Sequence, residues 1–217
     1  DHDDARAVVI AAEGKGFCAG ADMSMFGTID DPGDVRDYIL DHYKPLVETL
    51  TSMHKPVIAA VNGAAAGVGA SIALACDFRV MDEDAAIYQA FIKIGLVPDG
   101  GSTWLLARQI GYSRALEVAT SGEPIPAERC LELGLTNRVV PADELAGEAA
   151  GWAEKLAQMP TVAIGLTKEA MHHAMDHGLS STIEKEAELQ AEAAGTRDHR
   201  EGVAAFLEKR EPDFDGG

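Results

Sequence analysis

The sequence predicts an α/β fold, with a core over residues 1–125 and a helical C-terminal region over residues 126–217. Three observations predict this class. Two apolar runs rich in β-branched residues, at 6–12 and 55–63, are typical of buried strands, and each leads into a glycine-rich loop. The segment between them has helical spacing, which favours a parallel crossover. From about residue 114 the chain shows helical patterns alone.

The elements follow in chain order. After the strand at 6–12, apolar residues at helical spacing predict a helix over 34–52, with Pro45 as a potential kink. The strand at 55–63 precedes a helix over 68–76 whose small and apolar residues predict burial, and short strands are expected within 77–88. The C-terminal helices are expected within residues 113–122, 126–134, 143–159, 161–175, 180–195 and 198–214.

Composition and charge limit the classes of function. Of 217 residues, 36 are acidic and 18 basic, so the net charge of −18 repels nucleic acid and anionic membrane surfaces. An anionic ligand must therefore be held locally, by a few Lys or Arg and by backbone amides. No apolar run approaches the ~18 residues of a membrane span. Cys18, Cys76 and Cys130 are odd in number and widely spaced, which indicates reduced thiols in a cytoplasmic protein.

Two glycine loops, GKGFCAGAD at 14–22 and NGAAAGVGAS at 62–71, each follow a strand. Neither matches a dinucleotide fingerprint or a P-loop. Small residues allow close backbone approach, and the first amides of the helix at 68–76 lack intrahelical acceptors and carry about +0.5 charge from the macrodipole. One amide from each loop could converge on a developing oxyanion. Tight turns and helix packing explain the same glycines equally well.

The carboxylate of Asp99 stands in the stretch VPDGG, between Pro98 and the pair Gly100-Gly101. Pro presets its own φ, Asp bonds back to nearby amides and Gly accepts positive φ, so this pattern predicts a turn. The residues by themselves leave open whether Asp99 is a turn residue only or also a catalytic base.

Four segments of the chain, in this order and spacing, resemble the enoyl-CoA hydratase/isomerase (crotonase) family. They are GKGFCAGADMSMF at 14–26, the run at 55–80, IKIGLVPDGGSTWLL at 92–106, and EGVAAFLEKREPDF at 201–214. The resemblance implies a β-β-α spiral core (the ClpP/crotonase fold) with a helical trimerisation region, and an N-terminal segment of strands absent before Asp1.

The resemblance also implies the ligand and the partners. The substrate is an acyl-CoA thioester whose carbonyl lies between two backbone amides, which by position belong to Ala21 and Val68. No cofactor beyond the CoA moiety is implied, nor any nucleic acid or membrane partner, and the chain is expected to form a homotrimer or a dimer of trimers.

The resemblance implies a reaction type through the catalytic positions of the family at which this sequence has a carboxylate. Family hydratases use a pair of glutamates, and the matching positions hold Ser71 and Phe91, neither of which is an acid or base of that kind. Asp99 occupies the position of the catalytic Asp of several family isomerases. The similarity is strongest to the branch with the ring-epoxide isomerase of phenylacetyl-CoA breakdown and related Δ3-Δ2 enoyl-CoA isomerases. We therefore expect an isomerase that moves a proton through a thioester enolate, with a hydratase as the alternative.

Further residues are assigned by position. Met23, Met25, Phe26 and Tyr88 are candidates for an apolar acyl pocket, although all four also fit an ordinary core. Residues flanking the predicted oxyanion and base positions complete the candidate substrate site: Ala19, Asp22, Gly67, Ser71, Phe91 and Trp104.

The family's C-terminal segment often contacts the CoA of a neighbouring subunit, which implies Phe206 and Lys209 here. A structural Phe in an amphipathic helix is an open alternative for Phe206. A Lys found in some members after GAD is replaced by Ser24.

Two competing interpretations start from the residues themselves. Ser71, in Gly69-Ala70-Ser71, resembles a relaxed nucleophile elbow, and a serine hydrolase would also need a His from 171–177. His173 and His177 lie four apart on one helix, as metal ligands can, but no third ligand is evident, so no metal site is expected.

Overall fold

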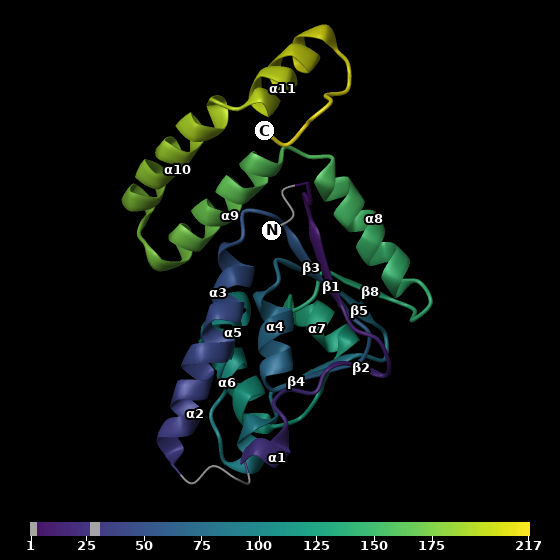
Figure 1. Ribbon diagram of the computed structural model, residues 1–217, viewed down its shortest axis with the longest axis vertical. Helices are drawn as coiled ribbons and strands as arrows, with labels where there is room; N and C mark the ends of the chain where they lie inside the picture. Colours follow the sequence, from purple (N-terminus) through teal and green to yellow (C-terminus); the bar gives the residue numbers. More distant parts are fainter. Residues whose placement is uncertain (1–3, 27–30) are drawn as a thin grey trace. The chain divides into compact units, whose positions relative to one another are not determined.

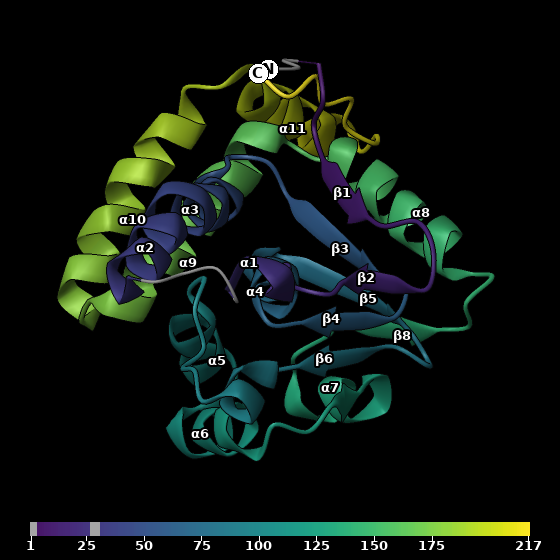
Figure 2. The same ribbon diagram turned by 60° about the horizontal axis from the view of Figure 1, so that its bottom comes forward.

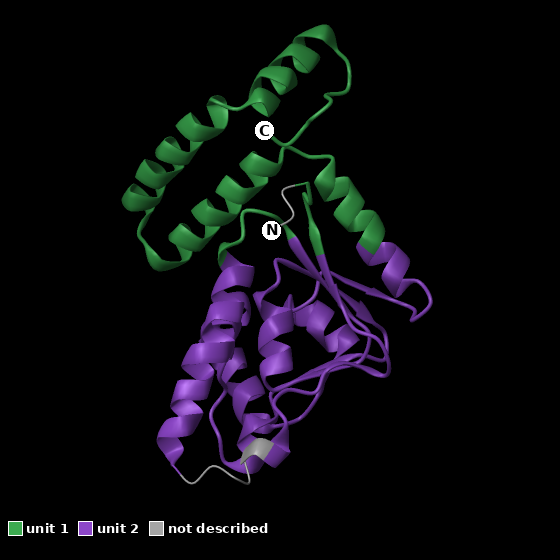
Figure 3. Ribbon diagram, viewed as in Figure 1, with its two compact units in different colours: residues 1–8, 52–56, 150–217 green, residues 9–51, 57–149 purple. Residues whose placement is uncertain are grey.

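The computed structural model describes residues 4–26 and 31–217, and for Met25 and Phe26 it describes the backbone only. The chain divides into two compact units (Figure 3). The larger unit comprises residues 9–51 and 57–149, and the smaller unit comprises residues 1–8, 52–56 and 150–217.

Two four-stranded sheets form the framework of the larger unit (Figure 2). One has the order β1-β3-β5-β8 and the other β2-β4-β6-β7. The strands are β1 (Val8–Ala11), β2 (Gly16–Cys18), β3 (Val57–Val61), β4 (Ala64–Ala66), β5 (Phe78–Asp82), β6 (Ala86–Tyr88), β7 (Ile125–Pro126) and β8 (Arg138–Val140). The pairs β3·β5, β5·β8, β2·β4 and β4·β6 are parallel, and β6·β7 is antiparallel. All residues of β3 are buried, as a continuous apolar run predicts.

The prediction of helices alone after residue 114 is wrong, because β7 and β8 lie in that region. Both strands are too short to show the period-two alternation by which a strand is recognised, and Pro126 is itself a strand-breaking signal. A second sheet arises within the glycine loops, where β2 and β4 form and pair with each other.

The helices of the larger unit include the buried one that the sequence predicts. This is α4 (Val68–Ala75), which buries seven of its eight residues and follows β4 directly. At the C-terminal end of α4, where the macrodipole is negative, the buried guanidinium of Arg79 donates to the carbonyls of Ala73, Leu74 and Cys76. The other α-helices that begin in this unit are α1 (Met23–Phe26), α2 (Pro32–Tyr38), α3 (Lys44–Ser52), α5 (Ser102–Ile110), α6 (Tyr112–Ser121), α7 (Ala127–Leu133) and α8 (Leu145–Ala157), whose C-terminal half lies in the smaller unit.

The segment predicted as one helix over 34–52 is helical but changes its winding. A π-helical turn over Ile39–Tyr43 separates α2 from α3, and Pro45 is the second residue of α3. Proline has no N–H to donate and its ring collides with the carbonyl four residues earlier in a regular α-helix. The wider turn precedes the proline directly, as expected where the regular hydrogen-bond ladder is interrupted.

Three helices, α9 (Thr161–Asp176), α10 (Leu179–Ala194) and α11 (Arg197–Glu208), make up most of the smaller unit (Figure 1). Its C-terminal segment folds back on α11, where the buried Asp198 carboxylate accepts from the amides of Asp215 and Gly216. Arg6 donates to the Phe214 carbonyl and to Thr161, which ties both ends of the chain to this unit. No helix among the described residues is long and apolar enough to cross a membrane.

Candidate active site

Asp99 lies in a turn whose geometry requires the glycines that follow it. Gly100 and Gly101 both have positive φ, +55° and +80°, and Gly101 is the N-cap of α5. The Asp99 carbonyl accepts from the amide of Ser102 at 3.1 Å, which closes the turn. The turn predicted from Pro-Asp-Gly is therefore confirmed.

The carboxyl group of Asp99 is poised to accept a proton near neutral pH. Burial raises its pKa from 3.8 to about 6, because removal from water disfavours the charged form. Its Oδ1 atom is buried and has no hydrogen-bond partner among the described residues. A carboxylate with an unused acceptor atom and a pKa near 6 has the properties of a general base.

The two glycine loops approach each other so closely that side chains are excluded. A Cβ on Gly20 would lie 2.8 Å from the Ala66 carbonyl oxygen, and one on Gly69 would lie 2.4 Å from that of Cys18. Gly67, with φ +55°, is the N-cap of α4, and a Cβ on it would lie 3.9 Å from the Gly20 Cα. Ala21 and Val68 directly follow these two facing glycines. This arrangement supports the predicted pairing of their amides, the second of which is at the positive end of α4.

The same helix also contacts the Asp99 turn. A Cβ on Gly100 would meet the Ser71 Cβ at 3.0 Å and a Val68 Cγ at 3.1 Å, and both residues belong to the first turns of α4. Phe91, in a 3₁₀ turn over Ala90–Ile94, is buried, with a ring atom 3.8 Å from the Cβ position of Gly67. The structure thus brings the predicted base and both predicted oxyanion residues to one end of α4.

Comparisons with known proteins agree with this geometry. A family model described as "Enoyl-CoA hydratase/isomerase" matches residues 1–217. The chain belongs to this family. It is 41% identical over 217 residues to the 1,2-epoxyphenylacetyl-CoA isomerase of Escherichia coli, a match covering 99% of this chain and 82% of that protein. It is 40% identical over 213 residues to a Rhodobacter capsulatus protein named "Probable enoyl-CoA hydratase", covering 98% and 82%.

Solved structures give the same result for the fold. The crystal structure of an enoyl-CoA hydratase from Polaromonas sp. JS666 superposes with a TM-score of 0.91 at 36% identity, covering 96% of this chain and 82% of that one. The predicted crotonase fold is confirmed, and the protein is an enzyme of the crotonase family.

Among the remaining residues predicted for this crotonase site, those before α1 are exposed. Asp22 caps that helix, and the hydrogen bond from the Ser24 amide lowers the pKa of its carboxyl. Ala19 is exposed and Met23 is 53% exposed, which suits a pocket rim better than a core. The side chains of Met25 and Phe26 lie outside the described residues.

The large side chains before and after Asp99 in the chain differ in burial. Ile94 is 53% exposed. Trp104 is half-buried and has the Arg108 guanidinium 4.1 Å above its ring, a cation–π contact. Tyr88 is half-buried at the end of β6.

Tyr43 is a neighbour of Asp99 that the sequence patterns do not indicate. Burial, followed by the effects of Tyr38, Asp99 and Cys18, raises the pKa of its hydroxyl to about 12, so it remains a neutral donor. Four residues further along the same helical segment, a Val47 Cγ lies 3.5 Å from the Cβ position of Gly101, which places this helix face over the turn.

The serine hydrolase interpretation finds no support at Ser71. Its hydroxyl donates to the Asp99 carbonyl at 2.9 Å and contacts the Ser102 hydroxyl at 2.8 Å, with no histidine among its described partners. His173 and His177 stack on each other at 3.8 Å, and His173 contacts the Ser181 hydroxyl. No cluster of three potential metal-ligating side chains exists within residues 4–26 and 31–217.

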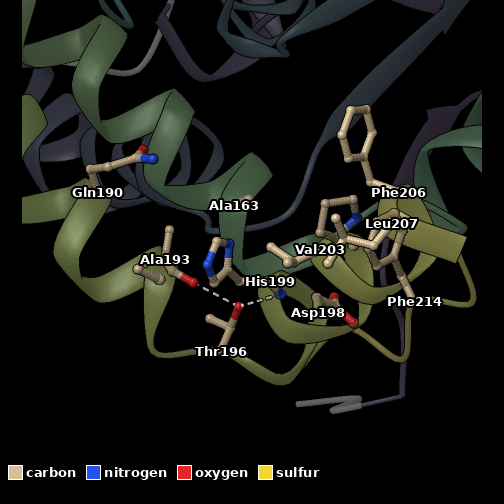
Figure 4. Close-up of a pocket in the computed structure, with 13 residues that line it drawn as sticks. Ala163, Gln190, Ala193, Thr196, Asp198, His199, Val203, Phe206, Leu207 and Phe214 are labelled. Atoms are coloured by element: carbon tan, nitrogen blue, oxygen red, sulfur yellow. Dashed lines mark hydrogen bonds between the residues drawn. The ribbon is translucent and has the colours of Figure 1, made fainter.

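The residues predicted to contact CoA lie on the surface of the smaller unit. Phe206 is 83% exposed and lines a cavity of about 430 Å³ between α9, α10 and α11 (Figure 4). Lys209, the C-cap of α11, is exposed and adopts φ +56°. Both side chains are accessible, and their contact with CoA stays a prediction.

Proposed function

We propose that this crotonase-family enzyme is an acyl-CoA isomerase in which Asp99 is the base that moves the proton. One observation carries the proposal: a half-buried carboxyl, whose Oδ1 has no partner among the described residues and whose pKa is raised to about 6, lies at the N-terminal end of α4. No carboxylate stands at Ser71 or Phe91 to act beside it.

The reaction follows from this pairing. The Asp99 carboxylate removes a proton from the carbon next to the thioester carbonyl, and the negative charge moves onto the carbonyl oxygen. The amides of Ala21 and Val68 hold that oxyanion, and the loss of one such donor typically lowers the rate by a factor of about 10² to 10³. The carboxylic acid then returns the proton to a more distant carbon, which leaves the double bond conjugated with the thioester.

Several finer assignments belong to the same proposal. The similarity to a 1,2-epoxyphenylacetyl-CoA isomerase supports a ring-bearing acyl group and a place in phenylacetate breakdown. We propose a homotrimer or a dimer of trimers, in which Phe206 and Lys209 of one copy contact the CoA of its neighbour; their exposure supports it. No cofactor beyond CoA is needed for proton transfer.

Hydration of 2-enoyl-CoA is the second candidate function, because relatives at about 40% identity carry that name. One experiment separates the two. The wild type is incubated with 3-enoyl-CoA and with 2-enoyl-CoA, and the conjugated thioester is followed by its ultraviolet absorbance. We expect absorbance to rise with the first and stay constant with the second, and Asp99→Asn to lower the rate of rise at least about 100-fold. Hydration by the wild type, or undiminished isomerisation by the variant, would reject the proposal.

A further inference from the structure

Three fully buried polar side chains of the larger unit form a chain of hydrogen bonds that ends on the backbone of Asp99. Gln89, Ser102 and Ser71 each have 0% exposed surface. Gln89 Nε2 is 3.2 Å from Ser102 Oγ, which is 2.8 Å from Ser71 Oγ, which is 2.9 Å from the Asp99 carbonyl oxygen. The three residues come from the segment after β6, the first turn of α5, and α4.

The direction of donation along this chain is determined by its last member. A carbonyl only accepts, and the Asp99 carbonyl, at 2.9 Å from Ser71 Oγ, is nearer than the Gly67 carbonyl at 3.5 Å, so the hydroxyl proton of Ser71 is assigned to Asp99. Ser71 Oγ must then accept from Ser102, whose own oxygen accepts from the Gln89 amide. In this direction both serine hydroxyl protons are donated inside the path, and Gln89 Oε1 is the one buried oxygen of these three side chains with no partner among the described residues.

The position of Ser71 links the base to the oxyanion amide. Ser71 lies three residues after Val68 on α4, so both side chains are on the same face of the helix. The Asp99 turn packs against this face, since the Cβ position of Gly100 lies 3.0 Å from the Ser71 Cβ and 3.1 Å from a Val68 Cγ. The hydrogen bond from Ser71 adds a directional contact between this helix and the Asp99 backbone.

We propose that Ser71, Ser102 and Gln89 are positioning residues, which set the distance between the Asp99 carboxylate and the Val68 amide. This inference rests on the proposed function. Ser71 would act through the backbone of Asp99, and its side chain would not touch the substrate. In an active site a displacement of about 1 Å costs up to about 100-fold in rate, so a missing hydrogen bond here has a measurable effect.

The test removes the members of this hydrogen-bond path one at a time in the 217-residue protein. Ser71→Ala keeps the hydrogen bond from the Ser102 backbone N–H to the Asp99 carbonyl, so the turn persists but loses its hydrogen bond to α4. We expect kcat for 3-enoyl-CoA to fall about 10- to 100-fold, with KM within about 2-fold. Ser102→Ala and Gln89→Leu, one and two steps further away, should have progressively smaller effects. If Ser71→Ala does not fold, the proposal is tested by whether Ser102→Ala lowers kcat more than Gln89→Leu does.

Two comparisons separate positioning from a general loss of stability. Ser121→Ala is the matched control, since that exposed hydroxyl donates to the Val118 carbonyl on α6 and its loss should leave kcat unchanged. On the residual activity of Asp99→Asn, Ser71→Ala should have no further effect, because a positioning residue acts only through the group it positions.

The outcomes are distinguishable. Unchanged kcat in folded Ser71→Ala, or its full effect persisting in the Asp99→Asn background, would overturn the positioning role alone. Full activity of the single variant Asp99→Asn would overturn the proposed function, and the positioning role with it.

Discussion

Replacing Asp99 with Asn should stabilise the folded protein above neutral pH while it removes the activity. The pKa of Asp99 is raised from 3.8 to about 6 by burial. Because this pKa is raised on folding, the contribution of Asp99 to the unfolding free energy is fully present below pH 3.8. It is lost as the pH rises through about 6. At pH 8 the buried carboxylate therefore destabilises the fold, and an Asn side chain, neutral at every pH, does not.

The size of the effect follows from the two pKa values. Between 3.8 and about 6, at about 1.4 kcal/mol for each pH unit, the ionised carboxylate costs about 3 kcal/mol of unfolding free energy. We expect Asp99→Asn to be about 2–3 kcal/mol more stable than wild type at pH 8. The difference should be under about 1 kcal/mol at pH 4, where Asp99 is neutral when folded and only about half ionised when unfolded.

Urea unfolding followed by circular dichroism, at one protein concentration for both chains, measures this difference. Asp143→Asn, on an exposed turn before α8, is the matched control and should change stability at neither pH. An equal gain for Asp99→Asn at pH 8 and pH 4 would attribute the effect to packing, and no gain at pH 8 would refute the burial argument.

Three further predictions concern the protonation of Asp99, the glycine loops and Arg79. Because Asp99 must be ionised to accept a proton, kcat should rise with pH through an apparent pKa of about 6, and a flat profile over pH 5–8 would contradict its role. Gly69→Ala should unfold the protein or abolish turnover, since its Cβ would lie 2.4 Å from the Cys18 carbonyl oxygen, whereas Gly147→Ala, in open space on α8, should stabilise by up to about 1 kcal/mol in thermal unfolding. Arg79→Lys should cost about 3 kcal/mol or more by urea titration, because an ammonium cannot satisfy the same buried carbonyls; near-wild-type stability would show that those carbonyls find other donors.

Sequence patterns predicted the parts of this fold in which local chemistry and burial agree. β3 is a continuous apolar run and α4 consists of small and apolar residues, so the local pattern by itself predicts that both are buried, as they are. β2 (Gly-Phe-Cys) and β4 (three alanines) could not be predicted, because a three-residue segment is too short to show a strand periodicity, and these two strands form by pairing with each other.

The candidate site shows the same division. The Asp99 turn is encoded within five consecutive residues and could be predicted from them. Gln89 and Ser102 could not, because their significance arises from a hydrogen-bond path that joins separate segments. Tyr43 faces the turn through a helical segment whose winding changes to π just before Pro45, so a regular 3.6-residue period does not place it.

The oxyanion amides and the base need different surroundings, and both are positioned by α4. The amides require their backbones in contact, which the glycines at 20, 67 and 69 allow by having no side chain. The base requires burial to raise its pKa, yet a buried carboxylate next to loosely packed loops would draw in water and lose that shift. The Asp99 turn packs at Gly100 directly on Ser71 and Val68, so the base is held by the same helix that supplies the amide. We therefore expect a shift of α4 to move the Asp99 turn and the Val68 amide together. A substitution that changes the distance between these two groups should lower kcat before it lowers stability.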